Sequence, residues 1–337
     1  MDSKGLITPE EWKYFCSDAV IMAKFEGFIY TANEHFNFEL IISDYLPLDS
    51  TKHEILCTLL QEDNTVIATT ILYKEITKGV NSLGQIDFLL PDSKQATKLI
   101  LKLEANLNTR FHTTSKVENI YELWLYPKYE EKAIDKMQKL LSNISETTLV
   151  QKNEESLYIT HSLATALQLL EKKQRVLLIP EEIKKSLDGF YCTDFWCYPM
   201  FRSISESVNK DIPVGTMGLY IDTKHPALNE FKTECYSTPQ WYEIITASKL
   251  AILDTLGHEI QPIVQMIDNF ERNYKLSLLF EANVLEGRLL ICTSKLHNII
   301  QYPEVLQFAK SIINYGLSDD FKPKVTLSYE DLANIFE

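Results

Sequence analysis

The stretch that decides the predicted fold of the second half is SLYITHSLATALQLLEKKQRVLLIP, residues 156–180. Its two ends, 156–161 and 175–180, are apolar runs that predict strands. The segment between them has helical periodicity and begins at Ser162, a residue type that favours helix N-caps. Strands that alternate with helices are typical of a mainly parallel, doubly wound sheet. This stretch therefore predicts an α/β domain.

The residues that follow continue the same pattern. Further predicted strands, with helical segments between them, are 216–222, 250–254 and 261–268. A hairpin is predicted over 275–296, and a last helix is predicted from Pro303 to Gly316. We expect a doubly wound α/β domain over residues 150–317 and a C-terminal tail over 318–337.

The first third has the pattern of an all-β domain. Its apolar runs are short, rich in Ile, Leu, Thr and aromatic residues, and separated by turn-prone residues. The runs are 36–45, 53–62, 65–76, 85–91, 97–106 and 119–127. Their period-two alternation indicates strands with one buried face. We expect an antiparallel, immunoglobulin-like β-sandwich over residues 20–127, after a linker at 1–19 and before a linker and helix at 128–149.

The composition excludes several classes of partner. The chain has 337 residues, with 33 Lys and Arg against 47 Asp and Glu, for a net charge of −14. This balance, with no basic patch, argues against nucleic acid and against an anionic membrane. No apolar run approaches the roughly 18 residues of a membrane-spanning helix, and the acidic N-terminus does not resemble a signal peptide. The six cysteines are expected to be reduced, mostly buried thiols.

The sequence lacks the motifs of common enzyme classes. Its ten glycines do not cluster into a phosphate-binding loop, and no Gly-x-Ser-x-Gly elbow occurs. The segments at His53 and His258 begin like a zinc-protease motif but lack its second His. We therefore predict no metal, no nucleotide and no other cofactor.

Two residues of the predicted α/β domain are candidates for ligand contact. His161 ends the first predicted strand, at the place where doubly wound folds bind ligands. The alternative for His161 is that its ring fills the turn between strand and helix. Trp241 begins a predicted helix, and the sequence leaves open whether it lies in the core or at the rim of a site.

The segment GFYCTDFWCYPMFRS, residues 189–203, is strongly aromatic but has no helical or strand period. Three interpretations compete: a metal or redox site on Cys192 and Cys197, a platform for a ligand, or a loop buried against another part of a larger protein. The first lacks a second Cys or His pair at ligand spacing. The other two make four residues candidates for ligand or domain contact, namely Asp194, Phe195, Trp196 and Tyr198.

A series of motifs in the second half resembles the C-terminal region of glycoside hydrolase family 2 proteins of the Bacteroides, β-galactosidase-like type. The motifs are Gly215–Gly218, Asp222–Leu228, Thr233-Glu234, Gln240–Tyr242, Gln261–Asp268 and Leu278–Ala282. The resemblance implies a β-sandwich followed by a flavodoxin-like or glutamine-amidotransferase-like α/β domain. It also implies a sugar-binding jelly roll and a catalytic barrel upstream of Ile7. No catalytic residue can be carried over, because no barrel motif occurs in this sequence.

Two functional hypotheses follow. The first is an accessory, non-catalytic region of a glycoside hydrolase in carbohydrate degradation. Its partners would be the catalytic barrel or the sugar-binding domain, and carbohydrate itself. The second is an independent hydrolase or transferase that uses the strand-end cleft, with His161, Asp194 and Glu234 as actors. The resemblance alone implies a periplasmic or extracellular location.

Overall fold

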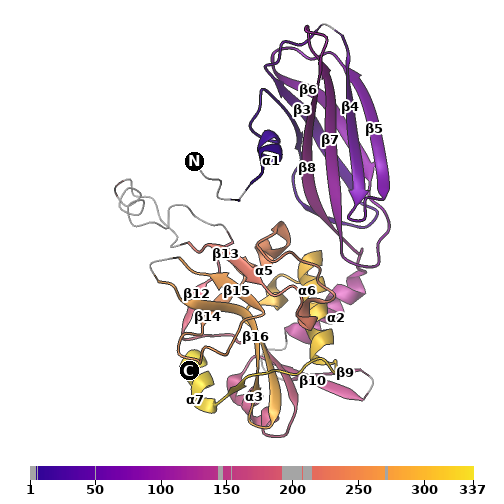
Figure 1. The fold of residues 1–337 in the computed structure, drawn as a ribbon. Helices are drawn as coiled ribbons and strands as arrows, with labels where there is room; N and C mark the ends of the chain where they lie inside the picture. Colours follow the sequence, from indigo (N-terminus) through magenta and orange to yellow (C-terminus); the bar gives the residue numbers. More distant parts are fainter. Residues whose placement is uncertain are drawn as a thin grey trace. The chain divides into compact units, whose positions relative to one another are not determined.

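The computed structural model describes residues 5, 7–49, 51–142, 147–152, 154–191, 207, 215–269 and 272–337. The chain forms two compact units, Met1–Lys128 and Tyr129–Glu337, which are called unit 1 and unit 2 (Figure 1). No helix among the described residues has the length and the apolar character needed to cross a membrane.

The described residues of unit 1 form one short helix and two sheets. The helix is α1 (Pro9–Lys13), which begins with a capping box between Thr8 and Glu11. One sheet has the order β1–β3–β6, from β1 (Ala19–Lys24), β3 (His35–Asp44) and β6 (Gly79–Leu89). The other has the order β2–β8–β7–β4–β5, from β2 (Ile29–Thr31), β8 (Thr114–Tyr126), β7 (Thr97–Asn108), β4 (His53–Gln61) and β5 (Val66–Lys74). Neighbouring strands are antiparallel except β2 and β8, which are parallel.

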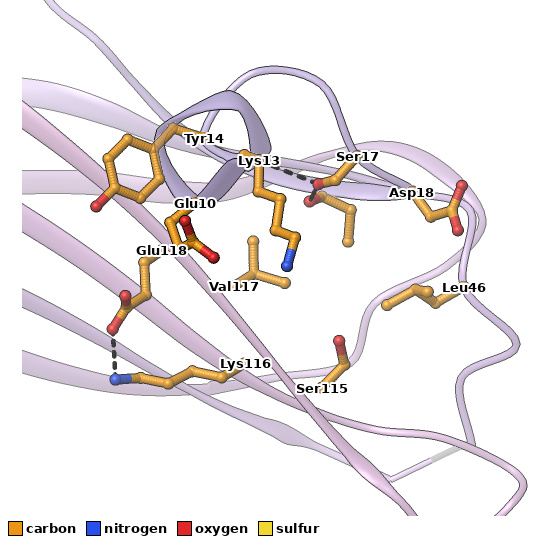
Figure 2. Close-up of a pocket in the computed structure, with 11 residues that line it drawn as sticks. Glu10, Lys13, Tyr14, Ser17, Asp18, Leu46, Ser115, Lys116, Val117 and Glu118 are labelled. Carbon is orange, nitrogen blue, oxygen red and sulfur yellow. Dashed lines mark hydrogen bonds and ion pairs between the residues drawn. The ribbon is translucent and has the colours of Figure 1, made fainter. Parts of the chain in front are cut away.

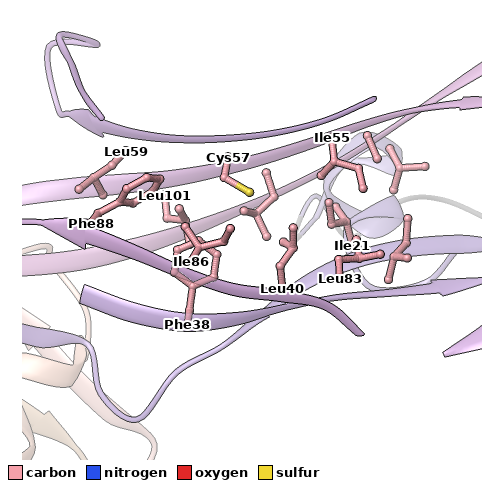
Figure 3. Packing of buried hydrophobic residues seen from close by; sticks show 14 of the residues in the cluster. Ile21, Phe38, Leu40, Ile55, Cys57, Leu59, Leu83, Ile86, Phe88 and Leu101 are labelled. Carbon is pink, nitrogen blue, oxygen red and sulfur yellow. The ribbon is translucent and has the colours of Figure 1, made fainter. Parts of the chain in front are cut away.

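The two sheets of unit 1 enclose one apolar core because their strands alternate. On β7, Leu99, Leu101 and Leu103 are buried, and the residues between them face away from the core. Figure 3 shows side chains of both sheets meeting, among them Phe38 of β3 and Cys57 of β4. Burial of each such side chain contributes about 1.5–3 kcal/mol. Burial also raises the pKa of the Cys57 thiol to about 12, so this thiol is a packing residue.

Unit 2 is built on a ten-stranded mixed sheet with a few short helices. The described strands are β9 (Thr148–Lys152), β10 (Glu155–Thr160), β11 (Arg175–Leu178), β12 (Ser186–Asp188), β13 (Gly218–Ile221), β14 (Lys249–Ile252), β15 (Val264–Ile267), β16 (Lys275–Val284), β17 (Gly287–Cys292) and β18 (Thr326–Leu327). The described α-helices are α2 (Glu131–Leu141), α3 (Leu163–Leu170), α5 (Tyr242–Thr246), α6 (Pro303–Gly316) and α7 (Tyr329–Phe336). Short 3-10 turns are η2 (Pro226–Leu228), η3 (Pro239–Trp241) and η4 (Leu296–Asn298).

The sheet of unit 2 contradicts the predicted fold class. β10, β11 and β17 are parallel neighbours, and β16 and β18 are also parallel. The other strand pairs of this described sheet are antiparallel, including β13–β15, β15–β16 and β16–β17. A doubly wound domain needs helical crossovers between parallel strands throughout its sheet. The prediction of such a domain is therefore wrong, and the protein is mostly β.

The physical reason lies in the connections between the later strands. The predicted strands over 216–222, 250–254 and 261–268 are present as β13, β14 and β15. The segments that join β15 to β16 and β16 to β17 are only 268–274 and 285–286. A parallel crossover needs a dozen or more residues, usually an α-helix. These connections are too short for that, so the strands pair antiparallel.

β10 and β11 pair in parallel because a helix connects them. α3 joins β10 to β11, and Val176 and Leu178 of β11 share an apolar cluster with residues of α3 and α7. Because β10, β11 and β17 run in the same direction, their carboxyl ends meet at one edge of the sheet. The first candidate site lies at this edge. It is formed by residue 161 and the segments 179–181 and 293–297, which follow the three strands.

Candidate functional site

His161 is buried where β10 ends, and both nitrogens of its ring face backbone carbonyl oxygens. Nδ1 lies 2.7 Å from the oxygen of Ile179, and Nε2 lies 2.8 Å from the oxygen of Leu141. A carbonyl oxygen only accepts hydrogen bonds, so both bonds form only when both nitrogens carry protons. Both ring nitrogens are thus placed against hydrogen-bond acceptors of the backbone.

The bond to Leu141 ties a helix to this edge of the sheet. Leu141 is the last residue of α2, so its carbonyl is one of those that a helix leaves without an internal partner. Nε2 of His161 lies 2.8 Å from this carbonyl oxygen and supplies its partner. His161 therefore acts as a C-terminal cap of α2.

Glu181 supplies the negative charge beside His161. Its Oε1 lies 3.4 Å from Nδ1 of His161 and 3.9 Å from Nε2 of His297. Its Oε2 lies 3.6 Å from Nζ of Lys295. The two imidazole rings are perpendicular, with centroids 5.5 Å apart. Glu181 thus lies beside two imidazole rings and the ammonium group of Lys295, where three parallel strands end.

The environment of His297 favours its neutral form. Burial lowers the pKa of His297, Glu181 opposes this shift, and the nearby His161 and Lys295 add to it. Its Nδ1 is buried without a hydrogen-bond partner, as is Oε1 of Glu181. A buried polar atom without a partner costs about 1–3 kcal/mol. His297 is therefore a neutral ring in a cluster that is not fully satisfied.

The same three side chains carry the donor types of a metal site. His161, Glu181 and His297 each offer a ligand atom, and these atoms lie within 4.8 Å of one another. A metal needs an unprotonated ring nitrogen with its lone pair directed at the ion. Both nitrogens of His161 are instead directed at carbonyl oxygens. A metal could bind here only if the hydrogen bonds that hold α2 were lost. The cluster is better described as a structural contact between α2 and the strand ends.

Trp241 lies in the core of unit 2. Its ring packs edge-on against Phe231 and Phe308, with centroids 5.0 Å and 5.4 Å away. Its Nε1 donates to Oγ1 of Thr233 over 2.7 Å, so the polar end of the ring is also satisfied. The ring is fully buried, and in this arrangement it does not form the rim of a site. His161 contacts Leu141 and Ile179, whereas Trp241 packs among other residues. The two candidates therefore do not form one site.

A further group of motif residues meets between η2, β16 and α6. Nδ1 of His225 accepts from the backbone N–H of Ala227, and its Nε2 lies 3.7 Å from Oε1 of Glu281. The hydroxyl of Tyr315 donates to Oε2 of Glu281 over 2.6 Å. Burial and this hydrogen bond both raise the pKa of Tyr315. Glu281 is therefore held between two partners from other elements.

Several sequence candidates lie outside the described residues. They are Asp194, Phe195, Trp196 and Tyr198, together with Cys192 and Cys197. Among the described cysteines, Cys57 and Cys292 are buried free thiols, whereas Cys16 and Cys235 are exposed free thiols. Three residues were candidates for catalysis by an independent hydrolase, and two of them are described. Both ring nitrogens of His161 lie against carbonyl oxygens, which leaves neither as a base. Glu234 is half-buried.

One pocket of unit 1 lies between α1 and β8, with a volume of about 370 Å³ (Figure 2). Lys13 extends from α1 toward Val117, and Lys116 pairs with Glu118 on the opposite wall. Its lining mixes both charge signs, and most of the α1 side chains on it are exposed. The lining therefore shows no preference for a cation or for an anion.

A second pocket of unit 1 was not anticipated from the sequence. It has a volume of about 570 Å³ and is lined by residues of three separate turns, among them Asp44, Tyr45, Lys78 and Arg110. Charged and aromatic residues within predicted turns are the signal that could have identified it, because binding residues concentrate on loops. Nothing local in the sequence shows that the three turns meet.

Comparisons with known proteins give family matches in both units and distant structural similarity. Domain of unknown function DUF8488 matches residues 34–127. A β-glucuronidase of Parabacteroides merdae is 12% identical, with a TM-score of 0.23, over 32% of this chain and 13% of that one. Spo0M, a sporulation control protein from Bacillus subtilis, is 10% identical, with a TM-score of 0.26, over 40% and 61%. A cohesin module from a family 33 glycoside hydrolase of Clostridium perfringens is 12% identical, with a TM-score of 0.25, over 34% and 100%.

These likenesses concern parts of β-glucuronidases and other β-domains, and the chain spans about an eighth of the glucuronidase that it matches. No curated protein matches the sequence. A second family match covers residues 158–337, which is more than half of the chain. On this match, the chain belongs to the family described as Domain of unknown function DUF8487.

Proposed function

We propose that this chain is an accessory, non-hydrolytic part of a β-galactosidase-like glycoside hydrolase, and that it serves carbohydrate degradation by packing against the catalytic domain. One observation carries the proposal: polar residues of the motifs that resemble that family pair with one another inside unit 2. Trp241 donates to Thr233, and His225 faces Glu281. Motifs that pair internally serve the fold of the unit.

The chemistry of glycoside cleavage supports the same conclusion. That reaction needs two carboxyl groups, about 5 Å or about 6.5–9.5 Å apart, on either side of the scissile bond. Glu281 is the carboxylate of the Leu278–Ala282 motif, and its side chain is only 12% exposed. Its hydrogen bond from Tyr315 joins β16 to α6, and its Oε1 lies 3.7 Å from Nε2 of His225, the residue before η2. This is a structural role.

Sedimentation velocity tests the proposal. The purified chain is mixed with the catalytic barrel of a β-galactosidase-like protein from the same organism, and an unrelated glycosidase barrel of similar size is the control. We expect a complex with the first barrel and none with the second. Absence of a complex at about 100 μM of each component, which corresponds to a very weak interaction, would contradict the docking role.

A further inference from the structure

The larger pocket of unit 1 lies where three turns of the two sheets meet. Asp44 ends β3, and the turn after it contributes Tyr45 and Leu48. The turn after β5 contributes Lys78, and the turn after β7 contributes Arg110. This site is called the loop-end pocket. Its volume of about 570 Å³ lies within the range of about 300–1,000 Å³ of small-molecule sites.

The walls of the loop-end pocket are braced by bonds between the turns. The backbone N–H of Arg110 donates to the carbonyl of Pro47 over 2.9 Å, and its Nε donates to the carbonyl of Leu48 over 2.8 Å. The N–H of Asp49 donates to the carbonyl of Asn108 over 3.1 Å. These bonds fix the turn after β7 against the turn after β3. The pocket is therefore preformed, which lowers the cost of ordering it around a ligand.

Asp44 places an acceptor in this pocket. Its residue is 1% exposed, and its Oδ1 accepts from the backbone N–H of Leu46 over 3.2 Å. No other described residue donates to this carboxyl. Burial raises the pKa of Asp44, whereas the N–H of Leu46 and the nearby His53 lower it. A ligand that donates hydrogen bonds to Oδ2 would satisfy this carboxyl.

The remaining groups define the chemistry of that ligand. The ring of Tyr45 is 60% exposed, and Nζ of Lys78 lies 5.8 Å from its centroid. Arg110 and Lys78 are donors, whereas Asp44 and Asp49 are acceptors. A simple ion prefers groups of one sign, but a saccharide donates and accepts through its hydroxyls and presents apolar C–H faces to aromatic rings. The mixed lining fits the saccharide.

We propose that the loop-end pocket binds a saccharide, with hydroxyls that donate to Asp44 and a ring face that stacks on Tyr45. This inference rests on the proposed role in carbohydrate degradation and names the ligand class and the site. It assigns sugar contact to unit 1.

Ligand-observed NMR titration of the full chain tests the pocket, with methyl β-galactoside and methyl β-glucuronide as probes and calcium chloride as an ion control. Tyr45→Ala removes the stacking surface, and Asp44→Asn keeps the acceptor for Leu46 but removes the charge. Tyr73→Ala is the matched control, because Tyr73 is 59% exposed on β5, outside this pocket. We expect saturable binding of at least one saccharide, weakened about tenfold by either pocket variant and unchanged in the control.

Saturable binding of neither saccharide, or binding that Tyr45→Ala leaves unchanged, would overturn the inference. Calcium binding that Asp44→Asn abolishes, without saccharide binding, would overturn it in favour of a cation. Docking to the catalytic barrel is measured separately with the same variants. Intact docking without saccharide binding rejects the pocket alone, and saccharide binding without docking rejects the docking role alone.

Discussion

Nε2 of His161 lies 2.8 Å from the carbonyl oxygen of Leu141, so a buried ring at the end of β10 caps the last residue of α2. The opposite nitrogen binds the carbonyl of Ile179, which follows β11. One ring therefore joins a helix and two strands. Oε1 of Glu181 lies 3.4 Å from Nδ1 of the same ring.

Replacement of His161 should destabilise unit 2 strongly. His161→Leu leaves the carbonyls of Leu141 and Ile179 without their ring partners, and each buried polar group left without a partner costs about 1–3 kcal/mol. Denaturant unfolding measures this loss. His258→Leu, at an exposed His of the same unit, is the control and should change stability by less than about 0.5 kcal/mol. A loss of unfolding free energy below about 1 kcal/mol for His161→Leu would show that these two hydrogen bonds contribute little to stability.

His297 should make the protein sensitive to acid. Its pKa in the folded state is lowered from the ordinary value of 6.5, chiefly by burial. The unfolded chain then binds the proton more readily, so the stability is present above about pH 6.5 and is lost as the pH falls toward the folded pKa. His297→Gln should flatten the fall of unfolding free energy between about pH 7 and pH 5. An identical slope in wild type and variant would contradict this origin.

Glu304 should act in the opposite direction. Burial, with a contribution from Glu243, raises its pKa from 4.5 to about 7, and its Oε2 is buried without a partner. A raised pKa stabilises the folded state below about pH 4.5, and this contribution is lost as the pH rises through about 7. Glu304→Gln should therefore raise the unfolding free energy at about pH 8 by roughly 1–3 kcal/mol, with little effect near pH 5. A variant that is less stable at both pH values would refute this.

Trp241 should behave as a core residue. Trp241→Ala removes a fully buried ring from its contacts with Phe231 and Phe308 and should cost about 3–5 kcal/mol. Trp12→Ala is the matched control, because that ring is 48% exposed on α1. Equilibrium unfolding monitored by circular dichroism compares the two. Similar small losses in both variants would mean that Trp241 is not a packing residue.

Strand positions could be predicted from the sequence, but strand directions could not. The run 53–62 corresponds to β4 and the run 97–106 to β7, because alternation of buried and outward residues is a local property. The direction of pairing in β13, β14 and β15 depends on connection length and on distant partners. An apolar run has the same composition in a parallel and an antiparallel sheet, and the α/β prediction failed for this reason.

The candidate sites show the same limit. The position of His161 at a strand end follows from the local pattern, but its two acceptors, Leu141 and Ile179, lie on other elements. Whether the ring is free for chemistry depends on those acceptors. The loop-end pocket is a tertiary feature as well, since Asp44 and Arg110 are far apart in the chain. Neither arrangement has a signature in a single segment.

The central claim, that the motifs of unit 2 serve the fold and docking of an accessory region, is tested most directly by a hydrolysis assay. Wild type and Glu281→Gln are incubated with nitrophenyl galactosides, glucuronides and mannosides, and the catalytic barrel serves as the positive control. We predict no turnover by either chain, because glycoside cleavage needs a positioned acid and a nucleophile or base, and Glu281 is bonded to Tyr315 instead. Turnover by the wild type that Glu281→Gln abolishes in a folded variant would contradict the account.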